Sequence, residues 1–475
     1  MACGDSPNVE VQNIRRRGSP YFRRPARRRG AALSAHHHSG KESLCRKKTV
    51  PDKTSAPPEL PQPSSAVASR RAFMAKVSGG MVSLAGVSAV GAETLADVPP
   101  RVVGANLSEL SERSSFVHLS RIPEATPGKR NVAITDAINS KTPLQDLVGT
   151  ITPSDLHYER SHSGVPSLDP TRHRLLLHGM TQKPRVLTLA DLKTMPSVSR
   201  QVFLECSGNG WENWHAADEH LTVQDMYGMI SMHEWTGVPL SFLVNWVGKD
   251  KAANWMLAEG GDASGMARSV PLTEEILSEA IVAYAQNGEP LRPAHGFPLR
   301  LIVPGFEGNL SVKWLRRLKF GDQPFMTRWE TARYTSLMRD GRARQFHLRQ
   351  EVNSVITSPS GTMTITPGYQ HISGLAWSGH GKITRVEIST DGALTWQTAE
   401  LNAPALPKAQ TRFQLAWEWR GEPTKLVSRA TDEKGHLQPN RKAVLDEMGP
   451  NAVFHYNGQQ TWAIDSQGMV RNVVA

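Results

Sequence analysis

The residue pattern of this 475-residue chain changes near Val352, and that change sets what the chain can fold into. Beyond it, apolar and polar residues alternate: ITRVEIS at 383–389 runs into an Asp-Gly turn with Trp396 in the next strand, and KLVSRA at 425–430 repeats the pattern. About 120 residues of this kind predict a β-sandwich. From 106 to 350, short strands and helices mix with Pro- and Gly-rich loops. The expected fold class is therefore α+β, with a mixed α/β domain at 106–350 followed by a β-sandwich at 351–475.

The first folded domain contains a few segments with clear periodicity. Strands are expected at Arg174–His178 and Gln201–Leu204, and helices at Thr188–Lys193 and Leu240–Val247. No Gly-x-Gly-x-x-Gly sequence follows a strand, and neither a P-loop nor an internal repeat occurs. Dinucleotide binding and nucleotide-phosphate binding therefore lack support.

The net charge of +11 is confined to the N-terminal part of the chain. Residues 1–92 hold 16 Lys and Arg against 5 Asp and Glu, whereas residues 93–475 hold 39 of each. The folded domains therefore show no basic bias that would favour nucleic acid. Residues 1–68, rich in Arg, Pro and Ser, are expected to form a disordered basic extension.

An export signal is expected at residues 69–92. SRRAFM at 69–74 precedes a weakly apolar stretch, rich in Gly, Ser and Ala, that ends at Ala92. This arrangement resembles a twin-arginine signal and predicts a periplasmic protein. A membrane anchor is the competing interpretation, but the stretch is short and Gly-rich. Since such signals begin near the chain start, we expect the true translation start to lie downstream of Met1.

Cys206 is the one cysteine expected in the mature chain, because Cys3 and Cys45 lie in the leader. A disulfide framework is therefore excluded there. Cys206 lies in QVFLECSGNGWENWH at 201–215, just after an apolar run and just before a Gly-Asn-Gly turn. Gly208 and Gly210 permit backbone amides to turn toward the sulfur, which suits a thiolate. From the residues alone, a nucleophile, a metal ligand, a redox switch and an inert buried cysteine all remain open.

Several motifs in order resemble the sulfite oxidase family of molybdopterin enzymes. They are ERSHSGVP at 159–166, ECSGNG at 205–210, WTGVPL at 235–240, QNGEPLRPAHGFPLRLIVPG at 286–305 and NLSVKWLRRLK at 309–319. The runs LAEGGDASGMARSVPL, GDQPFMTRWETARYTSLM and VNSVITSPS most resemble the SoxC branch, the molybdenum subunits of sulfane dehydrogenases. The resemblance implies a molybdopterin-binding domain of the sulfite oxidase fold and an immunoglobulin-like dimerisation domain.

The resemblance also implies roles for individual residues. Cys206 would ligate the molybdenum, one per chain, since a soft thiolate suits such a centre. Arg160 would clamp the anionic substrate, whose lost hydration must be replaced in a dry pocket. Tyr334 would be the active-site tyrosine, which can hydrogen-bond and help move protons. The cofactor-binding residues implied are His162, His295, Arg300 and Lys313. Trp235 is expected at the pocket mouth, and a place in the core is the alternative.

The implied reaction is oxygen-atom transfer to sulfur from a molybdenum that holds a terminal oxo group. No Cys-x-x-Cys-His occurs, so no haem is expected in this chain. The implied electron acceptor is a c-type cytochrome, SoxD-like, within a homodimer or a heterotetramer. The chain departs from animal and plant members at Gly210-Trp211, where those have basic residues. The substrate therefore stays open between sulfane sulfur on a carrier protein and free sulfite. A sulfoxide reductase and a cofactor-free binding protein are the alternative functions.

Overall fold

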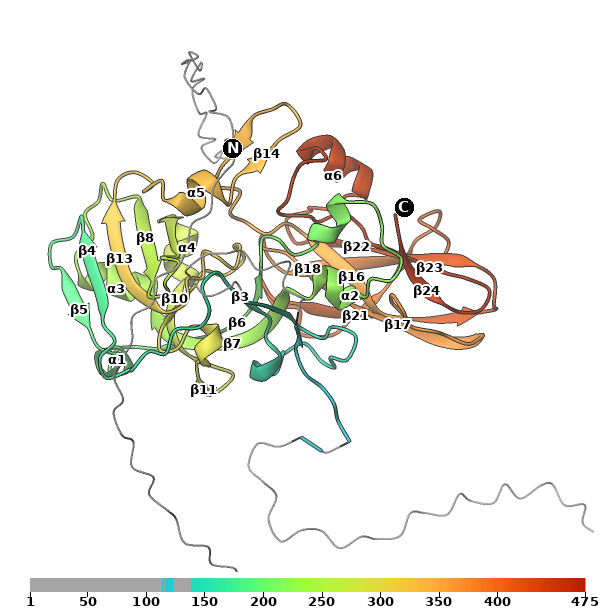
Figure 1. Cartoon of the computed structure of the whole chain (residues 1–475), viewed down its shortest axis with the longest axis horizontal. Coiled ribbons are helices and arrows are strands. Elements are labelled where there is room, and N and C mark those ends of the chain that lie inside the picture. Colours follow the sequence, from blue (N-terminus) through green and yellow to red (C-terminus); the bar gives the residue numbers. More distant parts are fainter. Residues whose placement is uncertain (1–112, 115, 124–137, 475) are drawn as a thin grey trace, which may run out of the picture. The chain divides into compact units, whose positions relative to one another are not determined.

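The computed structural model describes residues 113–474 except 115 and 124–137. The expected basic extension at 1–68 and export signal at 69–92 lie outside the described residues. Within the described part, no helix has the length and apolar character needed to cross a membrane. Two regions of sheet follow each other along the chain, in green to yellow and then in orange to red (Figure 1).

The first domain contains two five-stranded sheets and a small three-stranded one. One sheet has the order β5-β4-β13-β8-β9, in which β4 and β13 are parallel. Its strands are β4 (Leu175–Gly179), β5 (Arg185–Leu187), β8 (Trp255–Gly260), β9 (Ala267–Pro271) and β13 (Leu315–Gly321). The other has the order β11-β10-β7-β6 with β12 beside β10. Its strands are β6 (Val198–Glu205), β7 (Ile230–Pro239), β10 (Ile281–Gln286), β11 (Glu289–Pro290) and β12 (Arg300–Ile302). The small sheet is β1 (Ile122–Pro123), β2 (Ile138–Lys141) and β3 (Glu159–Ser161).

Short helices connect and cover these strands. They are η1 (Ser154–Leu156), α1 (Leu189–Lys193), η2 (Trp211–Trp214), α2 (Val223–Tyr227), α3 (Leu240–Trp246), α4 (Glu274–Glu279), η3 (Pro293–His295) and α5 (Arg328–Ala332). Thr188 begins α1 with a capping box to Asp191, which explains why a helix starts there. Leu175 and Leu177, two apart on β4, are both fully buried in a core that also includes Leu240 and Leu243 of α3. The two strands and two helices expected in this domain are all present, and their ends differ from the expected limits by three residues at most.

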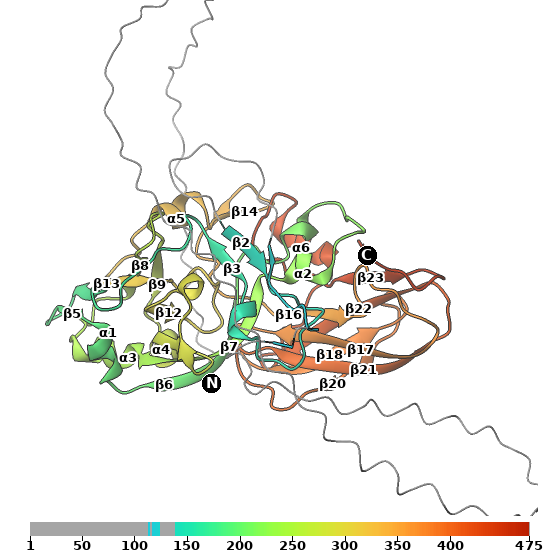
Figure 2. The ribbon, with the colours of Figure 1, turned by 60° about the horizontal axis from the view of Figure 1, so that its bottom comes forward.

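The second domain is a two-sheet sandwich, as expected. Its sheets have the orders β16-β17-β21-β20 and β19-β18-β22-β23-β24, and their strands run side by side in Figure 2. The strands are β16 (Asn353–Ser358), β17 (Gly368–Trp377), β18 (Ile383–Ser389), β19 (Gln397–Thr398), β20 (Glu400–Leu401), β21 (Thr411–Trp419), β22 (Thr424–Asp432), β23 (Thr461–Ile464) and β24 (Val470–Val473). The strand expected at 383–389 is exact, whereas Trp396 lies just before β19 and not inside it. Three buried tryptophans, Trp377, Trp419 and Trp462, fill its core.

The two domains share contacts close to Cys206. Glu205, the last residue of β6, is buried and accepts a hydrogen bond of 2.8 Å from the indole of Trp377. Phe203 of β6 lies in the same apolar cluster as the sandwich core. A hairpin of β14 (Ser336–Leu337) and β15 (Ala343–Arg344) lies beside α6 (Arg441–Met448). An ion pair between Arg339 of the hairpin and Asp446 of α6 joins the two. The cysteine loop is therefore held by both domains.

Candidate active site

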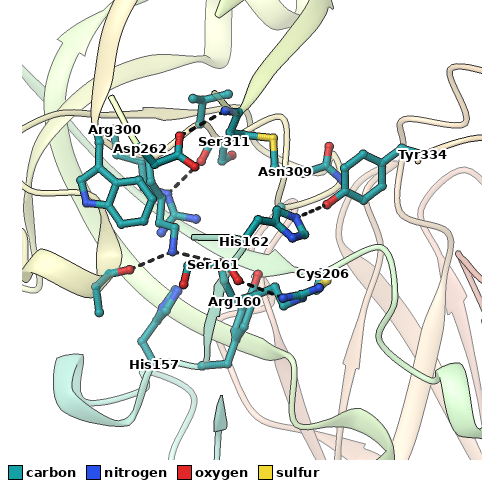
Figure 3. Close-up of a pocket in the computed structure, with 17 residues that line it drawn as sticks. His157, Arg160, Ser161, His162, Cys206, Asp262, Arg300, Asn309, Ser311 and Tyr334 are labelled. Atoms are coloured by element: carbon teal, nitrogen blue, oxygen red, sulfur yellow. Dashed lines mark hydrogen bonds between the residues drawn. The ribbon is translucent and has the colours of Figure 1, made fainter. Parts of the chain in front are cut away.

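A cleft opens in the first domain beside the Cys206 loop. Its walls come from seven places in the sequence: β3 with its flanks, the loop after β6, the loop between β8 and β9, η3, β12, the segment 308–314, and Tyr334 just after α5. Six of the eight residues singled out in the sequence line it, namely Arg160, His162, Cys206, Arg300, Lys313 and Tyr334 (Figure 3). The fold therefore gathers side chains that lie up to 174 positions apart in the sequence.

Cys206 follows directly on β6, and its loop is fixed by backbone hydrogen bonds. The Cys206 amide donates to the Met229 carbonyl at 3.0 Å. Gly210 adopts a φ of 78°, and a Cβ there would lie 3.2 Å from Tyr456, so the turn requires glycine. Burial raises the pKa of the Cys206 thiol, although the Gly208 amide and Arg160 act in the opposite direction. The expected amide contact thus exists, but in the protein alone burial outweighs it.

Arg300 and Lys313 are cations without an acidic partner in contact in the described structure. Arg300, on β12, is 4% exposed and donates to the carbonyls of Ser311 at 3.0 Å and His295 at 3.2 Å. Lys313 donates to the carbonyls of Arg160 at 3.0 Å and Ala294 at 2.9 Å. Burial lowers the pKa of Arg300 to about 10, and burial with the neighbouring Arg300 charge lowers that of Lys313 to about 7.

These two cations test whether the cleft fits a pterin with a phosphate tail. A buried cation that meets only carbonyl oxygens is costly, because nothing balances its charge. An anionic group in the cleft would restore that balance and accept charge-assisted hydrogen bonds. Cys206 lines the same cleft and offers a thiolate to a metal. The residues present therefore fit a molybdenum cofactor.

His295 lies behind the cleft wall and does not line it. It is 2% exposed, and neither of its ring nitrogens has a hydrogen-bond partner in the described structure. Its ring centroid lies 4.4 Å from that of His157, which does line the cleft. Burial and the nearby cations lower the pKa of both imidazoles well below the usual value, so both are neutral at pH 7. Two unsatisfied nitrogens of a neutral imidazole can take up either a donor or an acceptor.

Trp235 lies in the core rather than at the mouth of the cleft. It is fully buried, beneath the Arg300 guanidinium, whose Cζ lies 5.3 Å from the indole ring, and beside His157 at 5.9 Å. The expectation that it lines the mouth is therefore corrected. The reason is its position on β7, the strand between β6 and β10 in the middle of its sheet.

His162 and Tyr334 form a pair at one side of the cleft. The His162 Nε2 and the Tyr334 Oη are 3.0 Å apart, and they face each other in Figure 3. Burial, followed by the charge of Arg160, lowers the pKa of His162 to about 3, and burial raises that of Tyr334. Both groups are therefore uncharged at neutral pH. Arg160 is half-buried and keeps one nitrogen on the Ser161 carbonyl at 3.0 Å.

Several residues of the site were not found from the sequence. His157, Ser161, Asp262, Asn309 and Ser311 also line the cleft. His157 precedes the ERSHSGVP motif by two positions, which was a usable signal. Asp262 and Asn309 lie inside motifs that carry the family resemblance, but no role was assigned to either of them from the sequence.

Comparisons with known proteins agree with this geometry. Residues 162–329 match the model of the oxidoreductase molybdopterin binding domain, and residues 344–459 match that of the Mo-co oxidoreductase dimerisation domain. The crystal structure of the sulfane dehydrogenase SoxCD from Paracoccus pantotrophus is similar, with a TM-score of 0.72 and 41% identity over 78% of this chain and 96% of that chain. These similarities confirm the expected α+β fold class, with its molybdopterin-binding domain and dimerisation domain.

More distant relatives share the same region. Mitochondrial sulfite oxidase from Rattus norvegicus is 31% identical over 337 residues, which cover 65% of this chain and 61% of that protein. The Homo sapiens enzyme is 32% identical over 62% of this chain and 58% of that protein. The NADH nitrate reductase of Solanum lycopersicum is 32% identical over 66% of this chain and 38% of that protein. The chain thus spans about three fifths of the length of these sulfite oxidases.

Proposed function

This chain belongs to the sulfite oxidase family of molybdopterin enzymes, close to SoxC, and on that premise we propose that it is a molybdenum-dependent sulfane dehydrogenase. Its substrate is sulfane sulfur bound to a carrier protein during thiosulfate oxidation, and its electrons pass to a c-type cytochrome. The observation that carries the proposal is one cleft that contains Cys206 together with two cations, Arg300 and Lys313, that contact no acidic side chain among the residues the structure describes. Such a cleft suits a metal and an anionic tail at the same time.

The cofactor, when bound, supplies two-electron oxygen-atom transfer to sulfur. Cys206 would hold its metal, and Arg300 and Lys313 would hold its phosphate, with His295 behind them. The substrate is a persulfide anion, and Arg160 at the cleft wall offers it a charge-assisted hydrogen bond. Three water oxygens convert a terminal sulfane sulfur to a sulfonate, which releases six protons and six electrons. The protons need a route, and the Tyr334 phenol beside His162 can pass them one at a time.

Free sulfite is the second candidate substrate, since the sulfite oxidases are relatives. A steady-state assay separates the two, with purified holoenzyme, cytochrome c as acceptor, and either a persulfidated cysteine peptide or sulfite as donor. We expect faster cytochrome reduction with the persulfide. The Cys206→Ser protein is the matched control and should be inactive with both donors. Failure of the wild-type enzyme with both donors would refute the proposal.

A cofactor-free binding protein is the alternative of another class, and metal analysis separates it from an enzyme. We expect about one molybdenum per wild-type chain and none in Cys206→Ser. A native protein without molybdenum or pterin would favour the binding function instead.

The location and assembly of the protein also belong to this proposal. The SRRAFM sequence at 69–74 supports export to the periplasm by the twin-arginine route. Replacing Arg70 and Arg71 by Lys should leave the protein in the cytoplasmic fraction. The match of residues 344–459 to a dimerisation domain, and the similarity to SoxCD, support a dimer that binds a SoxD-like cytochrome. Sedimentation of the holoenzyme with and without the cytochrome tests both contacts.

A further inference from the structure

We propose that Arg268, on β9, is a positioning residue that holds the Tyr334 phenol at a fixed place relative to Cys206. The inference rests on the proposed function, because it assigns Arg268 a part in the chemistry of that same cleft. Arg268 does not line the cleft. It acts through the residues that do.

Arg268 is a fully buried guanidinium with a defined set of contacts. Its side chain is 0% exposed. Its Nε donates to Glu330 Oε1 at 3.1 Å, and its Nη2 donates to Glu307 Oε1 at 2.8 Å. The Arg268 Cζ lies 4.7 Å from the centre of the Tyr334 ring, within the range of a cation–π contact. The N–H groups at the edge of the guanidinium thus bind the two carboxylates, while its flat face packs on the Tyr334 ring.

The contact with Glu330 fixes α5, the helix that ends two residues before Tyr334. Glu330 is in α5, is 1% exposed and accepts a hydrogen bond of 2.6 Å from the Ser269 amide. The Tyr334 amide in turn donates to the Trp329 carbonyl of the same helix at 2.8 Å. Arg268 therefore contacts the Tyr334 ring directly, and it holds the Tyr334 backbone indirectly, through Glu330 and α5.

The other contacts of Arg268 reach the cysteine loop. Its Nη1 donates to Asn309 Oδ1, and Asn309 Nδ2 lies 3.3 Å from the Ser207 hydroxyl. Glu307 pairs with His455 at 3.3 Å, and the His455 amide donates to the Ser207 carbonyl at 2.8 Å. Ser207 follows Cys206 directly. One rigid guanidinium therefore sets the separation between the phenol and the residue that would hold the metal.

Charge balance in the core does not by itself require the planar hydrogen-bonding geometry of Arg268. Two buried carboxylates share one arginine, and a lysine could balance the same charge from a single point. A lysine cannot bond Glu330, Glu307 and Asn309 in one plane while it covers the Tyr334 ring. Arg268→Lys thus keeps the charge and removes the geometry, which separates positioning from folding.

The test compares holoenzymes carrying Arg268→Lys or Arg268→Gln, each with and without Tyr334→Phe. Arg317→Met is the control, since it breaks an ion pair with Glu259 in the same sheet, and neither residue lines the cleft. With Tyr334 present, we expect both Arg268 variants to load molybdenum normally and to lower kcat by about 10- to 100-fold, with KM within about twofold. In the Tyr334→Phe background the same changes should lower kcat by less than about twofold, because the group they position is gone. The control should retain wild-type kcat.

A crystal structure of Arg268→Lys gives a readout that needs no substrate. We expect the distance of 3.0 Å between His162 Nε2 and Tyr334 Oη to be lost. An unchanged distance with kcat within twofold of wild type would overturn the inference, as would an undiminished loss in the Tyr334→Phe background or a fall in molybdenum content parallel to the fall in kcat. A wild-type enzyme inactive with every sulfur donor would instead refute the proposed function, while the crystallographic distance would still test the positioning.

Discussion

The cofactor-free protein should become more stable as the pH rises above 7, because the Lys313 ammonium then loses its charge. The pKa of Lys313 lies at about 7, against 10.5 for an ordinary lysine, because of burial and the Arg300 charge. Since the folded pKa is the lower one, the unfolded chain binds more protons between these values, and the free energy of unfolding increases with pH across that window. Below pH 7 the full penalty of the buried ammonium is present.

The size of this effect follows from the shift. Each pKa unit corresponds to about 1.4 kcal/mol, so the whole shift corresponds to about 5 kcal/mol. Lys313 lines an open cleft and is only partly buried, so water reduces the penalty, and we expect a gain of about 2 kcal/mol between pH 7 and 9. A bound phosphate would pair with the ammonium and remove most of this dependence.

Urea unfolding of cofactor-free protein at pH 7, 8 and 9, followed by tryptophan fluorescence, measures the trend. Lys313→Gln is the matched variant, because its amide can still donate to the carbonyls of Arg160 and Ala294 without a charge. Other groups, such as Glu205, with a pKa raised by burial to about 7, titrate equally in both proteins and cancel in the difference. A wild type that shows no rise relative to Lys313→Gln, or a holoenzyme that shows the same rise, would refute this prediction.

Three further outcomes are expected. Gly210→Ala should lower the free energy of unfolding by about 1–3 kcal/mol and reduce molybdenum content, since φ is 78° and the new Cβ would lie 3.2 Å from Tyr456; urea unfolding and metal analysis check this. Burial acts to raise the pKa of Glu275, but its contacts with Arg349 and then Lys408 lower it to about 2. The free energy of unfolding should therefore decrease as the pH falls from about 4.5 to 2. Arg349→Met should make this decrease smaller, which acid titrations followed by circular dichroism measure. Tyr334→Phe should lower kcat at least 100-fold while molybdenum content stays constant, and an unchanged kcat would exclude the phenol from proton transfer.

The features that the sequence predicted correctly depend on local patterns. The strand at 383–389 alternates and ends in an Asp-Gly turn, so its limits could be read directly. Cys206 could be placed at the end of a strand because an apolar run precedes it and glycines follow it. The resemblance of ordered motifs then identified six residues that line one cleft, although their spacing gives no distances.

The features that the sequence did not predict depend on tertiary contacts. Arg268 lies in a run that carries the family resemblance, but its partners are 39 and 62 positions further along the chain, so the sequence does not show what it contacts. Trp235 could not be distinguished from a pocket residue, because an alternating strand shows which residues share a face but not which of two faces borders a cleft. The unsatisfied nitrogens of His295 likewise become visible only when the surrounding packing is known.

The departure at Gly210-Trp211 has a structural consequence for substrate choice. Trp211 begins η2, is 42% exposed and does not line the cleft. Arg300 and Lys313 are taken up by the proposed phosphate site, so among the described lining residues Arg160 is the cation left for substrate. A single guanidinium balances a persulfide, which carries one negative charge, better than a sulfite dianion, which needs more positive charge to offset its desolvation. One remaining cation in the cleft therefore supports the proposed substrate, a singly charged sulfur on a carrier, over free sulfite.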